Sequence, residues 1–268
     1  MAYLPGKKKR KEKHPERQEK YIRRQPRNED DDRLDIDLEK LKKAYEDLEA
    51  AHRQIRESHI EMILNLAIAA EYKDPDTGNH ILRISDYATE VAKAIKLSEE
   101  DTEILRYSSP MHDIGKIGIP DRILQKPGKL TADEWEIMKQ HTLIGARMFQ
   151  SSKAPLLKAA AQIAQSHHEW FDGNGYPYGL KGEEIPLFGR VVGMVDVFDA
   201  VVSKRCYKNA LSFLEGMEFI KKLAGSHLDP ELVNVFIKIK DRVRDIYDAN
   251  TSIQEFVKEF ESEKPDVG

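Results

Sequence analysis

From residue 71 onward the sequence carries a succession of helix-start signals and no apolar–polar alternation of strand length. Pro155 and Pro230 stand where a first helical turn tolerates proline. Capping boxes are found at Ser98 with Asp101, Thr131 with Glu134, Ser212 with Glu215, and Ser252 with Glu255. Helices are therefore predicted near residues 80–96, 99–112, 132–149, 155–168, 187–204, 213–224, 230–247 and 252–262. The expected fold class is all-α.

One long irregular segment interrupts this series. Residues 167–186, HHEWFDGNGYPYGLKGEEIP, contain four glycines and two prolines. A loop of this length inside a compact domain is usually functional, which makes the segment a candidate site.

The two ends of the chain are predicted to lie outside the folded domain. Residues 1–33 are almost wholly polar or charged, with too little apolar surface to offset the entropy of ordering. We expect them to form a disordered charged tail, and residues 263–268 to form a short C-terminal one. The basic cluster KKKRKEK could contact anionic lipid or nucleic acid, or remain a solvated tail. The net charge of −4 gives no overall reason to expect nucleic-acid binding.

Residues 34–70 are predicted to form one long helix with a heptad seam. The seam positions alternate by four and three residues: Leu34, Leu38, Leu41, Tyr45, Leu48, His52, Ile55, His59, Met62, Leu66 and Ala69. We expect a parallel dimeric coiled coil that passes a signal to the next domain, and so a homodimer. The alternative is an amphipathic helix folded back onto its own domain.

The single cysteine, Cys206, excludes an intramolecular disulfide and favours a reducing compartment. No apolar run approaches the roughly 20 residues of a membrane span, so no transmembrane segment is predicted. The basic N-terminus also lacks the apolar stretch of a secretory signal. The expected location is the cytoplasm.

Five histidines lie on or at the ends of predicted helices: His80, His112, His141, His167 and His168. A lone inward-facing histidine is more often an ordinary core residue, but these accompany two aspartates. Asp113 follows His112 directly, and Asp196 lies in VVGMVDVFDAVV, where an unpartnered carboxylate would be costly to bury. A metal would neutralise Asp196 and also account for the histidines. Imidazole and carboxylate ligands together suit iron, manganese, zinc or similar ions.

Three segments carry a resemblance to a known family over residues 74–231. MHDIGKIGIPDRILQKPGKL, HHEWFDGNGYPYGLKGEEIPLFGR and DVFDAVVSKRCYK resemble the HD-GYP family of the HD phosphohydrolase superfamily. A His-Asp pair alone is common, whereas the pair followed by a Gly-Tyr-Pro loop at this distance is highly specific. The resemblance implies an HD-type helical bundle, here residues 71–262. It also implies a centre of two or three metals, usually iron or manganese, bridged by an aspartate and a water or hydroxide.

The resemblance also assigns roles to individual positions. Seven residues match the metal ligands of the family: His80, His112, Asp113, His141, His167, His168 and Asp196. Asp113 matches the bridging carboxylate, and Lys116 matches a lysine that contacts the scissile phosphate. Tyr176, Arg205 and Lys208 match residues that hold the dinucleotide.

Two positions depart from the family pattern. Members with three metals carry a glutamate where this chain has Asp76, which is one methylene shorter. Two divalent ions are therefore expected, with a third left open. The usual Arg-Pro-Tyr is replaced by Arg205-Cys206-Tyr207, which frees the local backbone but removes no group needed for hydrolysis.

The activity implied by the resemblance is hydrolysis of cyclic di-GMP to linear pGpG in bacterial second-messenger signalling, and a second cleavage to GMP is left open. One alternative is an HD hydrolase acting on another cyclic dinucleotide, against which the full Gly-Tyr-Pro loop counts. The other is a non-catalytic cyclic di-GMP receptor, or an adaptor that docks protein partners through this loop. The complete ligand set counts against that second alternative.

Overall fold

The computed structural model describes residues 29–71, 79–203 and 210–249. Within these ranges the secondary structure is helical, and no β-strand is formed beyond an isolated bridge between Ala224 and Leu228. The all-α prediction is therefore confirmed. None of the helices in these ranges is both long enough and apolar enough to cross a membrane.

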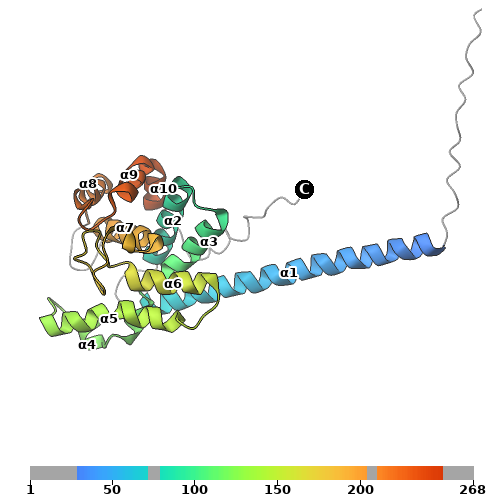
Figure 1. Cartoon of the computed structure of the whole chain (residues 1–268), viewed down its shortest axis with the longest axis horizontal. Coiled ribbons are helices and arrows are strands. Elements are labelled where there is room, and N and C mark those ends of the chain that lie inside the picture. Colours follow the sequence, from blue (N-terminus) through green and yellow to red (C-terminus); the bar gives the residue numbers. More distant parts are fainter. Residues whose placement is uncertain (1–28, 72–78, 204–209, 250–268) are drawn as a thin grey trace, which may run out of the picture. The chain divides into compact units, whose positions relative to one another are not determined.

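The helices follow one another along the chain, joined by short connections and by the loop that follows α6 (Figure 1). Their bounds are α1 (Glu29–Glu71), α2 (Asn79–Ala94), α3 (Glu99–Ser108), η1 (Ser109–Met111), η2 (Ile114–Gly118), α4 (Asp121–Leu124), α5 (Ala132–Phe149), α6 (Pro155–Ser166), η3 (Gly182–Glu184), α7 (Leu187–Val202), α8 (Phe213–Leu223), α9 (Pro230–Lys238) and α10 (Lys240–Asp248), where η marks a 3-10 helix.

The chain divides into two compact units, Met1–His52 and Arg53–Gly268. Helix α1 begins at Glu29, so residues 29–33, predicted to belong to the tail, are helical. Residues 1–28 lie outside the described part of the chain.

In the second unit, the C-terminal part of α1 is part of a core. Its residues Ile60, Leu64 and Ala67 are buried and pack with side chains of α2, α3 and α6. These are not the heptad seam: Met62 and Leu66 on that seam are 57% and 52% exposed. The face of α1 that packs within this unit is therefore different from the face that carries the heptad pattern.

Helix α7 occupies the middle of the larger core. It contacts α2, α6, α8 and α9, and Figure 1 shows it between α6 and the group formed by α8, α9 and α10. A helix that is apolar on all sides can be accommodated only in an interior. The buried apolar residues of α7 are Val191, Val192, Met194, Val195, Phe198, Val201 and Val202. The exceptions on this helix are Arg190, Asp196 and Asp199, and the two aspartates belong to the site described below.

Two predicted helices are interrupted where one continuous α-helix was expected. The helix predicted over 99–112 stops at Ser108 and continues as the 3-10 helix η1, since Pro110 cannot donate a backbone hydrogen bond. The helix predicted over 230–247 breaks at Ile239, whose ψ of 17° lies outside the helical range. The break allows both α9 and α10 to pack against α2.

The helix caps largely agree with the sequence. The capping boxes of Thr131 and Ser212 are both formed, which confirms those two helix starts. The Ser98 side chain accepts a hydrogen bond from the backbone N–H of Asp101, so Ser98 caps the N-terminus of α3. The predicted helix over 252–262 and its Ser252 box lie outside the described residues.

Candidate metal centre

Seven side chains converge where α2, α5, α6 and α7 meet the turn between η1 and η2. They form two groups, and within each group the possible ligand atoms all lie within 4.8 Å of one another. The first group is Asp113, His141, His167 and His168, and the second is His80, His112 and Asp196. The structure thus brings together all seven positions that the sequence singled out.

Glycines at two positions allow the elements that carry these residues to approach closely. A Cβ atom on Gly115 in η2 would collide with the carbonyl oxygen of His141, and one on Gly193 in α7 would meet that of His167. Backbone contacts of this kind require glycine. The turn that carries Asp113 is therefore held directly against α5, and α7 against the end of α6.

Asp113 lies between the two groups. Its Oδ1 is 3.3 Å from Nε2 of His141 and 3.5 Å from Nε2 of His167. Its Oδ2 is 3.4 Å from Nε2 of His112. Burial alone would raise the pKa of this carboxyl, but the positive charge of Lys116, together with the neighbouring His112 and His167 rings, outweighs burial and holds the pKa well below its usual range. Asp113 is therefore a carboxylate with one oxygen directed at each group, which is the arrangement that a bridging ligand requires.

The outer ring nitrogens fix the histidine tautomers. Nδ1 of His112, His141 and His167 lies 2.8–3.1 Å from the backbone carbonyl oxygens of Ser109, Met138, Ile163 and Ala164. A carbonyl only accepts, so each Nδ1 must donate and each neutral ring keeps its lone pair on Nε2. Metal-ligating histidines in proteins are usually oriented in this way.

The inner atoms of the first group lack partners. Nε2 of His141, Nε2 of His167 and Oδ1 of Asp113 are buried and have no hydrogen-bond partner among the described residues. Leaving such atoms unsatisfied costs about 1–3 kcal/mol each. Burial lowers the pKa of His141 to about 4 and also lowers that of His168, so both rings are neutral at pH 7. One divalent cation would satisfy all of these lone pairs, and the residues therefore fit a metal.

The second group is supported by Asp199, a residue that the sequence analysis did not single out. Asp196 Oδ1 is 3.4 Å from Nε2 of His80 and 4.0 Å from Nε2 of His112. On the other side of the His80 ring, Nδ1 donates to Oδ2 of buried Asp199 at 2.7 Å. Asp199 also accepts two hydrogen bonds from Arg83, at 2.6 and 2.8 Å. The available signal was its spacing, because Asp199 follows Asp196 by three residues on one helix.

These contacts set the charge states around His80. Burial opposes protonation of the ring, but the hydrogen bond from His80 to Asp199 and the charges of Asp199 and Asp196 raise its pKa overall. For Asp199, burial is outweighed by the hydrogen bonds from Arg83 and His80, which lower the pKa of its carboxyl. Asp199 is thus a fixed negative charge that orients the first ligand.

Lys116 lies one turn beyond Asp113. Its Nζ is 2.8 Å from Oδ2 of Asp113, and its side chain is only 16% exposed. The ammonium is therefore held at the edge of the centre through the carboxylate that joins the two groups.

The Gly-Tyr-Pro loop is attached to the end of α6 by Glu169, a second residue that the sequence analysis did not single out. This buried carboxylate accepts hydrogen bonds from the backbone of Tyr178 at 2.7 Å and of Leu180 at 3.0 Å. Tyr176 is placed with its ring centroid 4.8 Å from that of His168 and 6.4 Å from that of His141. The predicted substrate-binding tyrosine therefore lies directly beside two candidate ligands.

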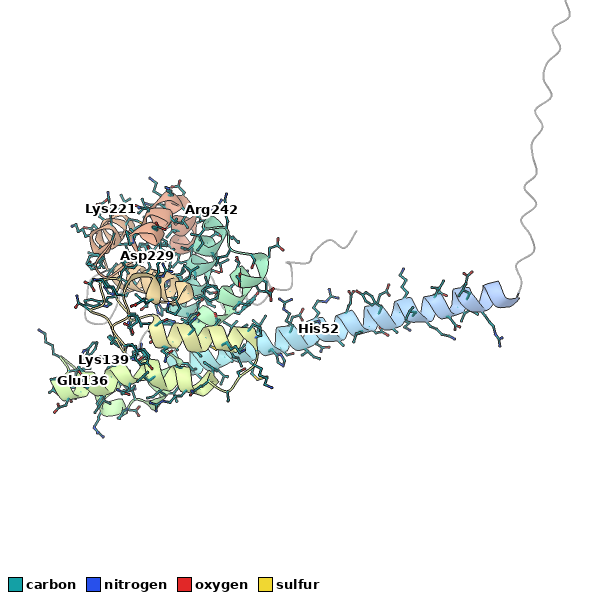
Figure 2. The ribbon with its side chains drawn as sticks, viewed as in Figure 1. His52, Glu136, Lys139, Lys221, Asp229 and Arg242 are labelled. Carbon is teal, nitrogen blue, oxygen red and sulfur yellow. The ribbon has the colours of Figure 1, made fainter. Side chains whose placement is uncertain are left out.

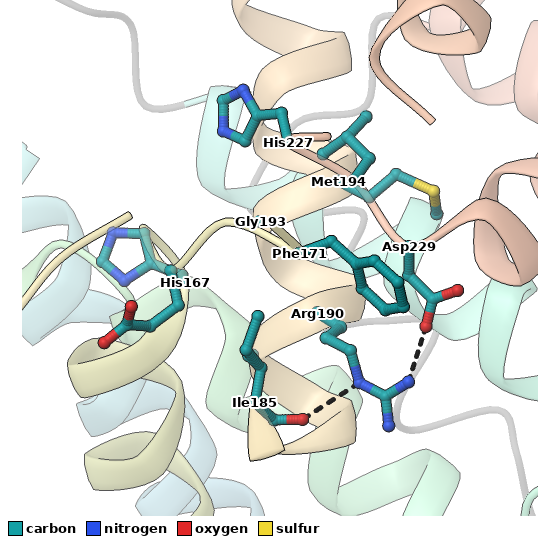
Figure 3. A pocket seen from close by; sticks show the side chains of 11 residues that line it. His167, Phe171, Ile185, Arg190, Gly193, Met194, His227 and Asp229 are labelled. Atoms are coloured by element: carbon teal, nitrogen blue, oxygen red, sulfur yellow. Dashed lines mark hydrogen bonds and ion pairs between the residues drawn. The ribbon is translucent and has the colours of Figure 1, made fainter. Parts of the chain in front are cut away.

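A small cavity lies behind His167, between the loop, α7 and the segment before α9 (Figure 3). Arg190 spans it, donating to the carbonyl of Ile185 at 3.0 Å and to Asp229 at 2.5 Å. Its volume of about 10 Å³ has room for no more than one water molecule. This cavity is a structural feature and cannot be the site of a nucleotide.

Three predicted site residues lie outside the described ranges. They are Asp76, Arg205 and Lys208, and the neighbouring Cys206 lies outside as well.

Known proteins resemble this chain over most of its length. A family model described as an HD domain matches residues 61–232. A cyclic di-GMP phosphodiesterase of Thermotoga maritima is 45% identical over 70% of this chain and 51% of its own length. The 3′3′-cGAMP-specific phosphodiesterase 2 of Vibrio cholerae is 40% identical over 69% of this chain and 35% of its own. The chain therefore spans about half, or less, of the length of these curated relatives.

A solved structure shows the same fold. It is that of a cyclic GMP-AMP-specific phosphodiesterase from V. cholerae, with a TM-score of 0.57 and 21% identity over 77% of this chain and 54% of that one. At this identity the likeness concerns the fold alone.

Proposed function

The chain belongs to the HD domain family, and from that membership we propose that it is a metal-dependent phosphodiesterase that hydrolyses cyclic di-GMP to pGpG, with GMP as the product of a second cleavage. The observation that carries this proposal is the pair of ligand groups joined by Asp113, with Lys116 held beside them. The name of the T. maritima relative supports the choice of substrate.

We propose two divalent ions, iron or manganese, which suit a mixed imidazole and carboxylate set. His80, His112 and Asp196 would hold one, and His141, His167 and His168 the other, with Asp113 shared. Such ions, when bound, lower the pKa of a bound water and offset the charge of a phosphodiester. Asp76 is the residue through which a third ion would bind.

The side chains divide the remaining work. Asp113 keeps a low pKa, so it stays ionised and binds rather than donates a proton. Lys116 presents an ammonium whose hydrogen bonds can turn from Asp113 to a phosphate oxygen, where positive charge stabilises the transition state. Tyr176 would contact the substrate beside the ligands, and Arg205 and Lys208 would hold its outer parts.

The test is hydrolysis of cyclic di-GMP by the full chain loaded with Mn²⁺, or with Fe²⁺ under anaerobic conditions, followed by chromatography of the products. Asp113→Asn keeps the size of the side chain but removes the charge that both groups share, and should abolish turnover while the helical circular dichroism is unchanged. Turnover of the variant at the wild-type rate would contradict the mechanism.

A second candidate substrate is cyclic GMP-AMP, because the V. cholerae relative is named as specific for it. The same assay run with both dinucleotides decides between them through the ratio of kcat/KM. A ratio that favours cyclic GMP-AMP by tenfold or more would replace the first proposal.

We also propose that α1 pairs with a second copy of this chain along its heptad seam. Every seam residue from Leu34 to Ala69 is exposed, and those beyond Arg53 avoid the face that packs within the second unit. Leu48→Glu should then lower the mass in light scattering at neutral pH, whereas Ala50→Glu on the opposite face should not. A wild-type chain that is monomeric at tens of micromolar would contradict the pairing.

A further inference from the structure

Trp135 is an exposed aromatic side chain near the candidate metal centre that the proposed function does not use. It lies in the first part of α5 and is 45% exposed. Its ring centroid is 5.8 Å from that of Tyr176, at an interplanar angle of 79°. Because Tyr176 in turn lies against His168, the three rings form a continuous series from the candidate ligands to the protein surface.

The start of α5 holds Trp135 firmly in this position. Thr131 and Glu134 form a reciprocal capping box, and Nζ of Lys126 is 2.6 Å from the Glu134 carboxylate. The backbone N–H of Trp135 also donates to Thr131 at 2.9 Å. A large aromatic side chain on such a rigid element is exposed to solvent but keeps a fixed position, and binding sites require side chains that are held in place in this way.

A cation lies on the same side of α5, one turn further on. Nζ of Lys139 is 5.9 Å from the centroid of the Tyr176 ring and 2.8 Å from the carboxylate of Glu136. The Lys139 side chain is 24% exposed and that of Glu136 67% exposed, and Figure 2 shows the two together on α5. The ammonium is therefore kept near the rings by a partner that an anionic ligand can displace.

We propose that one base of the cyclic dinucleotide stacks on the Trp135 ring, in the corner that this ring forms with the nearly perpendicular Tyr176 ring, and that Lys139 supplies positive charge beside that nucleotide. This inference rests on the proposed function and assigns Trp135 and Lys139 to substrate binding. Stacking on an aromatic ring tolerates any base, because every base has a π face. Trp135 therefore contributes to affinity and not to the choice between guanine and adenine.

The chain offers a matched control for this assignment. It has two tryptophans, and the other one, Trp170, is 36% exposed. The Trp170 ring packs on His227 at a centroid distance of 4.4 Å, and neither residue contacts the Tyr176 ring in the part of the chain that the structure describes. The two tryptophans thus share similar exposure but only Trp135 adjoins the candidate site.

The first experiment is steady-state hydrolysis by the metal-loaded full chain. Trp135→Ala should raise KM roughly tenfold or more, with kcat changed by less than about threefold, and by the same factor for cyclic di-GMP and cyclic GMP-AMP. Trp135→Phe should restore most of the affinity, and Trp170→Phe should match the wild type. An unchanged KM in Trp135→Ala, or a loss confined to kcat, would overturn the proposal.

The second experiment uses fluorescence and needs no turnover. Trp170→Phe leaves Trp135 as the sole tryptophan, and its emission should be quenched as cyclic di-GMP is added to the Asp113→Asn form. The matched Trp135→Phe protein, which reports on Trp170, should show no quenching. If the wild type fails to hydrolyse either dinucleotide but Trp135 is still quenched, the proposed activity fails and the stacking site stands. Absence of both turnover and quenching overturns both.

Discussion

Replacing Asp199 by asparagine should weaken metal binding although Asp199 is not itself a candidate ligand. Its carboxylate accepts from Nδ1 of His80 at 2.7 Å and from Arg83 at 2.6 and 2.8 Å. Asparagine has nearly the same shape, but its amide nitrogen would have to face either His80 or Arg83, and both are donors. The substitution therefore removes the charge and one acceptor together, and the His80 ring loses its fixed orientation.

The size of the effect follows from these contacts. Loss of a residue that orients a metal ligand typically costs 10- to 100-fold in metal affinity, which is about 1.4–2.7 kcal/mol. Asp199 is fully buried and forms an ion pair with Arg83, whose side chain is 20% exposed, so removing this negative charge should lower the free energy of unfolding by a further ~3 kcal/mol. In Asp199→Asn, the loss in the free energy of unfolding should therefore exceed the loss in the free energy of metal binding.

Asp229→Asn provides the matched control. Asp229 is also buried and also paired with an arginine, Arg190, but it contacts no candidate ligand (Figure 3). Titration with Mn²⁺ by calorimetry, together with urea unfolding with and without the metal, separates the two losses. Asp229→Asn should lower stability alone. Wild-type Mn²⁺ affinity in Asp199→Asn, or an equal loss of affinity in both variants, would refute the reasoning.

Three other perturbations have definite outcomes. Lys116→Met should lower kcat about 100-fold with bound metal unchanged, since its ammonium acts on the phosphate; metal content that falls with activity would contradict this role. Glu169→Gln should raise hydrogen exchange across 171–182, because the amide accepts only one of the two loop N–H groups; unchanged protection would exclude the anchor. In the unfolded chain His141 takes up a proton near the ordinary histidine pKa of 6.5, whereas in the folded protein burial lowers its pKa to about 4. The metal-free protein should therefore lose about 2 kcal/mol from this residue as the pH falls from 6.5 to 5, a loss that His141→Gln removes in urea titrations.

The sequence by itself determined the helical class and most of the helix starts. Local chemistry is sufficient for this: the Thr131 and Ser212 caps depend on residues only three apart, and they form as expected. The same holds for the seven candidate ligands, whose residue types are costly to bury on apolar helices without a metal. The His-Asp pair and the Gly-Tyr-Pro loop indicated the family, because motifs of this kind retain their spacing.

Only the tertiary structure decided how the candidate ligands are divided between two groups. The ligands divide into two groups with Asp113 between them because η2 contacts α5 and α7 contacts α6. These contacts join segments that are far apart in the chain. The interaction of Asp199 with His80 spans 119 residues, and no local pattern could pair them. Likewise, the heptad pattern of α1 could not reveal that Ile60 and Leu64, off the seam, form its buried face. Periodicity identifies faces that are apolar, whereas the packing of distant elements determines which face is covered.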